Sequence, residues 1–379
     1  MIGVDLEQFT RDPYGSGIQR VLQFLALRWP TSVPAHFLMP DPDRDGVLIQ
    51  LDPASAAAIV TIPFSGLPGD MDLRAEVLAA IRRTSAPRLS SASITDEYTN
   101  WLLPEVSYLP SVLERFEAAR SSMRTAMIGY DALPMTEPAN YRFKPGSAAW
   151  VSEYFRMLAV ADSVVCISDY SRDVIRQRLR RPESALTTIA HPGGDHVAIR
   201  PGSPPQRTRF CRVGTMEERK YPVEILEGFV AAVERGLDAE LVFVGRRSAS
   251  KDAINKRIDS AIDAGYPITW VEDASDEHVS ETINHSSVFL SFGIEGYGIP
   301  VLEAIRLGTP VVYDGIQPAA ELMQGRGSMR VLGATTDQLT AMFEQVPAQL
   351  TEVRDQLEPD AVPTWQDFTE HVVQSVLDS

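Results

Sequence analysis

Residues 288–313 read VFLSFGIEGYGIPVLEAIRLGTPVVY, and this stretch decides the fold class. The apolar run Val288–Phe292 predicts a buried strand, and a second apolar run at Pro310–Tyr313 predicts another. Between them, Pro300 stands near the start of a helix-period pattern, where proline is well tolerated. A strand, a helix and a strand in this order predict one unit of a parallel α/β sheet.

The same alternation extends outward from Phe210 to Leu332. Further strands are predicted at RFCRVG (ending in Gly214), Glu240–Val244 and Ile268–Val271, and helices from Pro222, over Asp252–Ala264, over Asp276–Asn284 and from Pro318. Doubly wound sheets of this kind bind ligands beyond the carboxyl ends of their strands. The functional edge is therefore expected in three loops, which are Gly214–Lys220, Gly245–Arg247 and Gly293–Gly298.

The first half of the chain has less regular patterns. Its predicted strands are Ile2–Leu6, Ala35–Met39, Val47–Leu51, Ala126–Gly129, Ser163–Ile167 and Leu186–Ala190. The loop RDPYGSG leads into a predicted helix at Ile18–Leu27, and a last helix is predicted over Thr364–Leu377. Periodicity does not order residues 52–122. The segment Pro192–Thr208 is rich in Pro and Gly, which predicts a linker.

Length and charge bound the class of protein. A chain of 379 residues exceeds the about 250–300 residues at which single cores stop growing, so two domains are expected. We expect the first at residues 1–195, a linker at 196–208, the second at 209–357 and a crossover helix at 358–379. The 35 Lys and Arg against 51 Asp and Glu give a net charge of −16, which argues against a nucleic-acid binder.

Cysteine usage and the N-terminal sequence bear on the compartment. Cys166 and Cys211 both stand in apolar, strand-like runs, so no disulfide framework is expected and a reducing cytosol fits best. The N-terminal MIGVDLEQF lacks the basic region of a secretory signal. No apolar run approaches the roughly 20 residues that cross a bilayer. We therefore expect a soluble, cytoplasmic chain.

One basic stretch stands out against this acidic background. Residues 172–220 contain eleven Arg and Lys against five Asp and Glu. The run from Arg172 to Arg181, RDVIRQRLRR, would form a basic helix face that can meet anionic lipid at the inner face of a membrane. The alternative is a solvated helix face beside a phosphate-binding cleft.

Two glutamates frame the glycine-rich turn in the stretch that decides the fold. Gly296 and Gly298 flank Tyr297 and let backbone approach a ligand closely. The N-terminus of the next helix favours an anion such as a diphosphate. Glu303 lies about one turn in, where a carboxylate can accept hydrogen bonds from a ribose diol, and Glu295 stands in the loop before it. The alternative is a tight strand–helix turn with a glutamate that caps the helix.

Two more loops carry weaker signals. In Gly214-Thr-Met-Glu-Glu-Arg219-Lys220, two adjacent cations after a strand can neutralise phosphate charge. The alternative is a solvated pair offset by the two preceding glutamates. Near the N-terminus, Gly15-Ser-Gly17 opens a helix after the first predicted strand, but a lone Gly-x-Gly favours a plain turn unless the other motifs support a site.

Taken together, these motifs resemble the GT-B retaining glycosyltransferases of family 4, or group 1. FGIEGYGIPVLEAIRLGTPVV is similar to the family's E-x7-E signature, and VGTMEERKYP to its strand–loop element with the Arg-Lys pair. YGSGIQRVLQFL resembles the glycine loop and first helix of O-antigen and polysaccharide mannosyl- or deoxyhexosyltransferases, and VVCISDYSRDVI a strand end before the linker. The resemblance implies two Rossmann-like, doubly wound parallel-sheet domains that face a cleft, and a C-terminal helix that crosses back to the first. It also implies that the first domain binds the acceptor and the second binds the nucleotide sugar.

The resemblance also implies roles for particular residues. Glu303 would hold the ribose of the donor nucleotide, and Glu295 would face the donor sugar. Arg219 and Lys220 would bind the diphosphate and stabilise the leaving group. The remaining donor-binding positions would be Gly214, the Gly296–Gly298 amides with Tyr297, and Gly17 across the cleft.

The sequence departs from the family at one position. Where the family commonly has a His-Asp pair after a first-domain strand, this chain has Tyr130-Asp131, and Asp131 would keep its catalytic place. One hypothesis is that the exchange shifts donor choice toward a sugar that lacks the 6-hydroxyl. The alternative is that the Tyr130 hydroxyl does the same work as the family's histidine.

The implied activity is transfer of a sugar from a nucleotide-diphosphate donor to a glycan or lipid-linked glycan, with retention at the anomeric carbon. No metal or other cofactor is expected, since protein cations replace a metal and the six histidines form no H-E-x-x-H cluster. The sequence leaves GDP, dTDP and UDP donors open. Alternatives are a GT-B nucleotide-sugar epimerase, a phosphorylase-like relative, and a catalytically silent partner protein.

Overall fold

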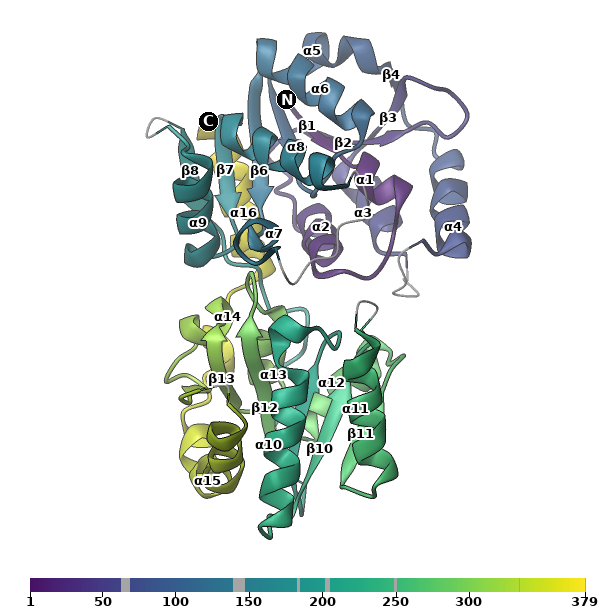
Figure 1. Cartoon of the computed structure of the whole chain (residues 1–379). Helices are drawn as coiled ribbons and strands as arrows, with labels where there is room; N and C mark the ends of the chain where they lie inside the picture. The colour runs from purple at the N-terminus through teal and green to yellow at the C-terminus, as the bar shows by residue number, and fades with distance from the viewer. Residues whose placement is uncertain are drawn as a thin grey trace. The chain divides into compact units, whose positions relative to one another are not determined.

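The structure, a computed structural model, describes residues 1–62, 69–138, 147–182, 185–201, 205–248, 251–333 and 335–378. The chain divides into two compact units, each built around one sheet (Figure 1). The first unit comprises Met1–Ala132, Phe143–Pro192 and Trp365–Ser379. The second comprises Leu133–Arg142 and Gly193–Thr364.

The first unit holds an eight-stranded sheet in the order β4-β3-β2-β1-β5-β6-β7-β8. These strands are β1 (Ile2–Asp5), β2 (Ala35–Pro40), β3 (Val47–Leu51), β4 (Arg88–Ser90), β5 (Asn100–Leu103), β6 (Arg124–Gly129), β7 (Ser163–Cys166) and β8 (Leu186–Ile189). Along the sheet, neighbouring strands pair in parallel through β2, β1, β5, β6, β7 and β8. Strand β3 instead pairs antiparallel with both β2 and β4. The sheet is therefore mixed at this edge, where the sequence predicted parallel strands alone.

The antiparallel edge follows from the length of one connection. β2 ends at Pro40 and β3 begins at Val47, so a short polar loop joins them. A parallel connection needs about a dozen residues or more, so this loop can only close a hairpin. Gly46 supports the turn with a φ of +70°, a left-handed conformation that suits glycine.

The helices of the first unit include several that the sequence analysis did not predict. They are α1 (Glu7–Arg11), α2 (Gly17–Leu27), α3 (Pro53–Val60), α4 (Met71–Arg82), α5 (Ile94–Glu97), α6 (Pro110–Ser122), α8 (Ser147–Val160), α9 (Asp169–Leu179) and α16 (Trp365–Asp378). The prediction that the C-terminal helix returns to the first unit is confirmed, because α16 packs there. Trp365 is fully buried and stacks on Phe24 with ring centroids 4.5 Å apart, and the Asn100 amide donates to the Val376 carbonyl at 2.7 Å.

The second unit holds a six-stranded, wholly parallel sheet in the order β11-β10-β9-β12-β13-β14. Its strands are β9 (Thr208–Val213), β10 (Ala239–Val244), β11 (Ile268–Val271), β12 (Val288–Ile294), β13 (Val311–Ile316) and β14 (Ser328–Arg330). Its helices include α7 (Leu133–Thr136), α10 (Pro222–Glu234), α11 (Asp252–Asp263), α12 (Asp276–Asn284), α13 (Ile299–Arg306), α14 (Pro318–Leu322) and α15 (Thr336–Asp355). The predicted alternation of strands and helices is thus confirmed.

An aromatic cluster anchors α15 to the second unit's core. Phe343 of α15 meets Phe210 and Phe229 edge to face, with ring centroids 4.8 and 5.3 Å apart. Helices α10 and α15 approach so closely at Gly228 that a Cβ there would lie 2.6 Å from the Cβ of Leu339. α15 was not predicted because Pro347 interrupts its pattern, and proline usually breaks a helix interior.

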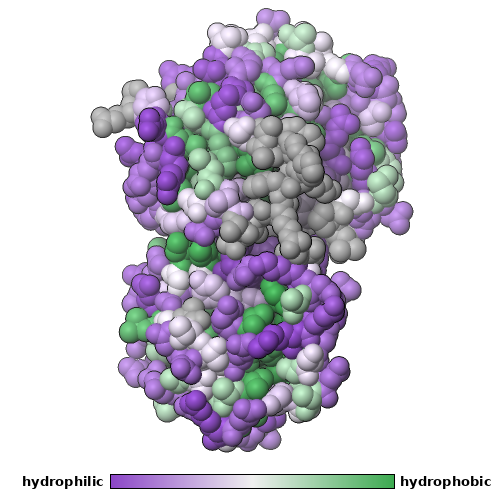
Figure 2. Space-filling model, in the orientation of Figure 1, coloured by the Kyte–Doolittle hydropathy of each residue, from purple (hydrophilic) through white to green (hydrophobic). Residues whose placement is uncertain are grey.

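Hydrophilic residues cover most of the face shown in Figure 2, in keeping with the net charge of −16. Cys166 lies in β7 and Cys211 in β9, where both are buried as free thiols. Among the described residues, no helix is both long and apolar enough to cross a bilayer.

Candidate active site

The second unit gathers charged side chains where β9 and β12 end. β9 ends at Val213, and after a short loop a single 3-10 turn, η3 (Glu218–Lys220), presents Arg219 and Lys220. Tyr221 follows in a left-handed conformation with a φ of +53°. Such a conformation is unusual for a bulky residue and turns the chain sharply before α10 starts at Pro222. The two predicted cations therefore stand on a tightly bent loop.

Glu295, the first residue after β12, pairs with both cations. Arg219 donates to Oε2 of Glu295 at 3.1 Å, and Lys220 Nζ lies 2.5 Å from its Oε1. Burial alone would raise the pKa of Glu295, but Lys220 and Arg219 outweigh it and hold this pKa at about 2. Glu295 is thus ionised at neutral pH, and the structure brings three predicted site residues into one cluster.

Gly293 makes this cluster possible through a close approach of two backbones. Its φ is +93°, and a Cβ at this position would lie 1.9 Å from the carbonyl oxygen of Arg219. Only glycine lets the end of β12 and the η3 loop touch in this way. Gly214, a predicted site residue, stands beside the same cluster, since a Cβ there would lie 3.3 Å from Lys220 Nζ.

A third cation, Arg212, lies beneath the loop and was not predicted. It is 3% exposed, and its guanidinium donates to the carbonyls of Gly214 and Thr215 at 3.0 and 3.5 Å. Burial lowers the pKa of Arg212 to about 10, which still leaves it charged at neutral pH. The sequence did contain a sign of this residue, because an arginine stands inside the apolar strand RFCRVG. A charge is costly to bury unless it is paired or hydrogen-bonded, so such an arginine indicates a specific role.

The surroundings of the cluster leave it with positive charge in excess. Arg219 also pairs with Glu217 at 2.7 Å, so two carboxylates face three cations. The side chains of Arg219 and Lys220 are each 15% exposed and that of Glu295 is 22% exposed, so all three can be reached from outside. An anion is the ligand that this arrangement favours.

The glycine-rich turn after Glu295 leads directly into α13. Gly298 occupies the residue before the helix with a φ of +106°, and Pro300 stands in the first turn as predicted. The Tyr297 side chain is only 4% exposed and is packed inside the unit, so its phenol does not line the surface. What Tyr297 and its two glycines present to a ligand is backbone at a helix N-terminus, which suits an anion.

Glu303 lies on α13 and has a partner that sequence analysis missed. His196 Nε2 lies 2.8 Å from Oε1 of Glu303, and their side chains are 14% and 9% exposed. The segment that carries this histidine is held along α13, because Arg306 donates to the Val197 carbonyl at 2.8 Å and Arg200 N–H to the Arg306 carbonyl at 3.1 Å. No periodicity marked His196, because its segment forms neither helix nor strand.

The other predicted site residues belong to the first unit. Gly17 opens α2, and a Cβ there would meet nothing within 4 Å. Tyr130, just after β6, is 5% exposed and donates its hydroxyl to the Pro104 carbonyl at 2.7 Å. Asp131 is the next residue and is partly buried. Across the ranges the structure describes, no group of three or more His, Cys, Asp or Glu could hold a metal ion.

Comparison with known proteins agrees with this geometry. Residues 199–334, which contain the whole charged cluster and Glu303, match the family of glycosyl transferases group 1. This stretch is a glycosyl transferases group 1 domain. Part of the chain is 31% identical over 117 residues to the serotype-specific mannosyltransferase WbdA of Escherichia coli. That alignment covers 30% of this chain but only 14% of the relative, so the chain spans a small part of WbdA.

Solved structures extend the likeness from the group 1 domain to the whole chain. HepE of Anabaena in complex with UDP-glucose superposes with a TM-score of 0.67 at 13% identity, covering 100% of this chain and 99% of HepE. The lipopolysaccharide outer core galactosyltransferase WaaB gives 0.60 at 13% identity, with 100% and 99% covered. Identities this low establish the fold alone. The predicted GT-B fold is confirmed.

Proposed function

We propose that the chain is a retaining glycosyltransferase of family 4 that moves a sugar from a nucleotide-diphosphate donor to a glycan or lipid-linked glycan, in the synthesis of a cell-surface polysaccharide such as O-antigen. The observation that carries this proposal is the cluster of Arg219, Lys220 and Glu295 inside the group 1 domain. It combines accessible cations with a neighbouring helix N-terminus, which is what a diphosphate leaving group requires.

The mechanism rests on charge placement. As the bond between sugar and diphosphate breaks, negative charge grows on the departing oxygens, and Arg219 and Lys220 stabilise it. Arg212 fixes the loop that carries them through its bonds to Gly214 and Thr215. A diphosphate would share both cations with Glu295, whose carboxylate is then placed to accept from hydroxyls of the donor sugar. The buried surroundings strengthen each of these interactions relative to water.

Retention and independence from metal belong to the same proposal. The acceptor attacks from the face that the diphosphate leaves, and its proton passes to the departing phosphate. Three cations beside two carboxylates supply positive charge that a metal ion would otherwise bring.

The nucleotide is held through Glu303, which accepts from the ribose hydroxyls. GDP-mannose is the first donor to test because the matched relatives are named mannosyltransferases. UDP-glucose is the second, because HepE was solved with it. The hydroxyl of Tyr130 donates to the Pro104 carbonyl inside the first unit, so it is not free to replace the family's histidine. A 6-deoxyhexose donor is therefore the third to test, as the alternative to these two 6-hydroxylated sugars. A donor panel with full preference for a 6-hydroxylated hexose would remove this alternative.

We also propose that the chain works in the cytoplasm and contacts a membrane through the exposed part of α9. Arg176 and Arg178 are exposed there. Arg181 cannot take part as predicted, because it is 7% exposed and donates to the carbonyls of Leu158, Ala161 and Leu186. Flotation with liposomes that contain anionic lipid tests this contact, and flotation that does not depend on anionic lipid excludes it.

Calorimetric titration with UDP, GDP, dTDP and ADP tests the proposed function. One nucleotide should bind, and Glu303→Ala should abolish the binding. Glu352→Ala, an exposed position on α15, is the matched control and should bind like the wild type. Binding without turnover of any sugar donor would favour the silent partner, and conversion of the donor sugar without an acceptor would favour the epimerase.

A further inference from the structure

Within the described residues, two side-chain-bearing positions have a left-handed backbone, and they differ in what explains it. Arg180, with a φ of +50°, directly follows helix α9, and a left-handed residue is common at the end of a helix. Tyr221, with a φ of +53°, instead precedes α10. The residue before a helix is normally extended and often caps it with its side chain, and Tyr221 does neither. Its conformation therefore does not serve the helix.

The local sequence opposes this conformation. A left-handed backbone brings Cβ close to the following carbonyl oxygen, so it costs free energy for most residues other than glycine. Pro222 follows directly, and a proline favours an extended conformation for the residue before it. Tyr221 departs from both preferences. Such a departure persists only where the surrounding structure imposes it, and it is typical of functional sites.

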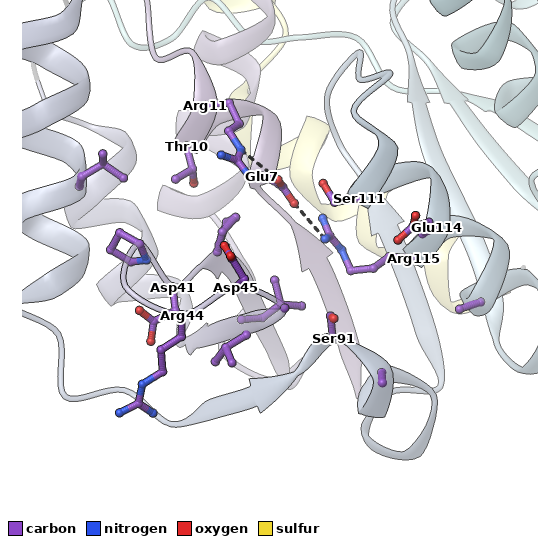
Figure 3. Close-up of a pocket in the computed structure, with 18 of the residues that line it drawn as sticks. Glu7, Thr10, Arg11, Asp41, Arg44, Asp45, Ser91, Ser111, Glu114 and Arg115 are labelled. Atoms are coloured by element: carbon purple, nitrogen blue, oxygen red, sulfur yellow. Dashed lines mark hydrogen bonds and ion pairs between the residues drawn. The ribbon is translucent and has the colours of Figure 1, made fainter.

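A second charged cluster shows that ion pairs alone do not require a strained backbone. In the first unit, Glu7 pairs with Arg11 and Arg115 at the wall of a cavity between α1, α4, α6 and the loop that joins β2 to β3 (Figure 3). These three residues stand in the regular helices α1 and α6 with negative φ angles. The cluster around Glu295, by contrast, lies directly beside the strained residue. The strain there therefore has another cause than the pairing of charges.

The side chain of Tyr221 holds its backbone in place. The ring is partly buried and packs against the core cluster of the second unit, which contains Phe210 and Phe229. The N–H of Tyr221 donates to the Glu218 carbonyl at 3.0 Å, and its own carbonyl accepts from Ile225 N–H at 3.0 Å. The ring and these two hydrogen bonds together fix Tyr221 at the start of α10, so its φ cannot relax without loss of packing.

The residues that Tyr221 fixes are the two cations. Arg219 and Lys220 precede it directly, and a Cβ on Gly293 would lie 1.9 Å from the carbonyl oxygen of Arg219 and 2.9 Å from Cα of Lys220. The loop is therefore held by β12 on one side and by Tyr221 on the other. Because α10 is packed in the core, a change of φ at Tyr221 would move the cations away from Glu295 rather than move the helix.

We propose that Tyr221 is a positioning residue: its left-handed backbone, anchored by its ring, holds Arg219 and Lys220 in the arrangement that the departing diphosphate requires. The inference rests on the proposed function, since it concerns the same cations. A misplacement of about 1 Å at such a site can cost on the order of 10²-fold in rate, which favours a strained but rigid residue over a flexible one.

The test compares variants of Tyr221 that differ in their tolerance of a left-handed backbone. Tyr221→Phe keeps the ring and should turn over the donor like the wild type. Tyr221→Asn loses the ring but suits the conformation, so kcat should fall by no more than about fivefold. Tyr221→Val excludes the conformation because valine is β-branched, and kcat should fall by about 10²-fold with a much smaller change in KM for the donor.

Two further variants make this series specific to the backbone at Tyr221. Tyr221→Ala lacks the ring, as Tyr221→Asn does, but suits the conformation less well, so its kcat should lie between those of Tyr221→Asn and Tyr221→Val. Gly236→Val is the matched control, because it forces a valine into a φ of +104° at the other end of α10, where a Cβ meets nothing within 4 Å. Its kcat should equal that of the wild type.

A readout without donor tests the position of the cations directly. Lys220 and Arg219 hold the pKa of Glu295 at about 2, so the Glu295 carboxyl carbon of the wild type should not titrate between pH 4 and 7 by NMR. In Tyr221→Val the cations move away and burial raises this pKa, so the carbon should titrate within that range. Arg212 in β9 also acts on Glu295 and is unchanged in the variant. The resonance is assigned by its absence in Glu295→Gln.

The outcomes separate this inference from the proposed function. A titrating Glu295 in Tyr221→Val, with a loss of kcat that Gly236→Val does not share, supports the inference. It is overturned if Glu295 does not titrate in Tyr221→Val, or if Tyr221→Asn or Gly236→Val loses as much activity as Tyr221→Val. Turnover by the wild type with kcat unchanged in Tyr221→Val removes the inference alone. A wild type that neither binds a nucleotide nor turns over a donor removes the proposed function, and with it the role of Tyr221 in the reaction.

Discussion

Glu105 follows β5 in the first unit and Glu295 follows β12 in the second, so both carboxylates stand just beyond the carboxyl end of a parallel strand. Burial raises the pKa of Glu105 to about 8, against only a hydrogen bond from Phe9 N–H at 2.8 Å and one with Gln19. Burial acts on Glu295 too, but Lys220 and Arg219 hold its pKa at about 2. A buried carboxyl group at this position is therefore protonated or ionised at neutral pH, depending on whether cations lie beside it.

The comparison separates two uses of a buried carboxyl. Glu105 fastens the segment that leads to the glycine loop, because it accepts from Phe9, while Gln19 donates to the Asp12 carbonyl and accepts from Tyr14 N–H. Glu295 sits among accessible cations that a ligand can share. Glu105 holds the backbone of the first unit, whereas in our proposal Glu295 takes part in binding the donor. Four experiments test this difference.

The largest expected effect is on the stability of the first unit. The folded state keeps the Glu105 proton up to about pH 8, whereas the unfolded chain releases it near 4.5. Stability from this group is therefore full below pH 4.5 and falls as pH rises through 8, by on the order of 5 kcal/mol. Urea denaturation at pH 5, 6.5 and 8, followed by tryptophan fluorescence, measures this slope, since four of the five tryptophans belong to the first unit.

Glu105→Gln should flatten that slope, because an amide still accepts from Phe9 but does not titrate. Glu76→Gln, at an exposed site on α4, should leave the slope as in the wild type. An unchanged slope in Glu105→Gln would show that another group carries the pH dependence.

The next effect concerns turnover. In the proposed mechanism, Arg219→Ala removes one of the two accessible cations that stabilise the leaving group, so kcat should fall by about 10²–10³-fold, as for other transition-state donors. Initial rates with the donor identified by calorimetry give the ratio. Arg326→Ala, at an exposed site of the same unit, is the control. A fall in donor affinity with kcat unchanged would assign Arg219 to binding alone.

The third effect is the acid counterpart of the first. Because the folded pKa of Glu295 is lowered from 4.5 to about 2, its contribution is present above pH 4.5 and is lost as pH falls through 2. The loss should be on the order of 3 kcal/mol. Acid titration monitored by circular dichroism should show a shallower decline for Glu295→Gln than for the wild type. Equal declines would mean that the ion pairs add nothing to stability.

The smallest effect tests whether His196 positions Glu303. His196→Ala should weaken binding of the ribonucleoside diphosphate by about tenfold, because Glu303 loses the side-chain contact that positions its carboxylate. The 2′,3′-dideoxy analogue should bind equally to the variant and the wild type, and His196→Gln should restore part of the loss. His278→Ala, at an exposed site on α12, is the control. An equal loss for both nucleotides would indicate a general disturbance of the fold.

The second unit was largely predictable because five of its six strands and most of its helices carry an uninterrupted pattern; β14 (Ser328–Arg330) has only three residues and was not predicted. Ile268–Val271 and Asp276–Asn284 begin and end where the apolar pattern does. In the first unit, the helices and strands of residues 52–122 could not be predicted, because short elements such as α5 (Ile94–Glu97) span too few turns to show a period. The antiparallel pairing of β3 with β2 depended on loop length, which a search for repeated βα units does not weigh.

The candidate site divides in the same way. Arg219, Lys220 and Glu295 were predictable because each stands in a loop directly after a predicted strand, where a parallel sheet places its ligands. Arg212 and His196 were not, since one lies within a strand and the other in a segment without regular structure. Their contacts arise from packing against residues distant in sequence, and a local pattern does not contain that information.

The return of α16 to the first unit has a consequence for synthesis on the ribosome. Most of the first unit emerges before any of the second, yet Phe24 and Asn100 gain their partners Trp365 and Val376 only after the whole second unit has been translated. For that interval, the nascent first sheet lacks part of its cover. The second unit does not depend on residues that are translated after it. We therefore expect the second unit, although it is translated later, to complete its fold before the first.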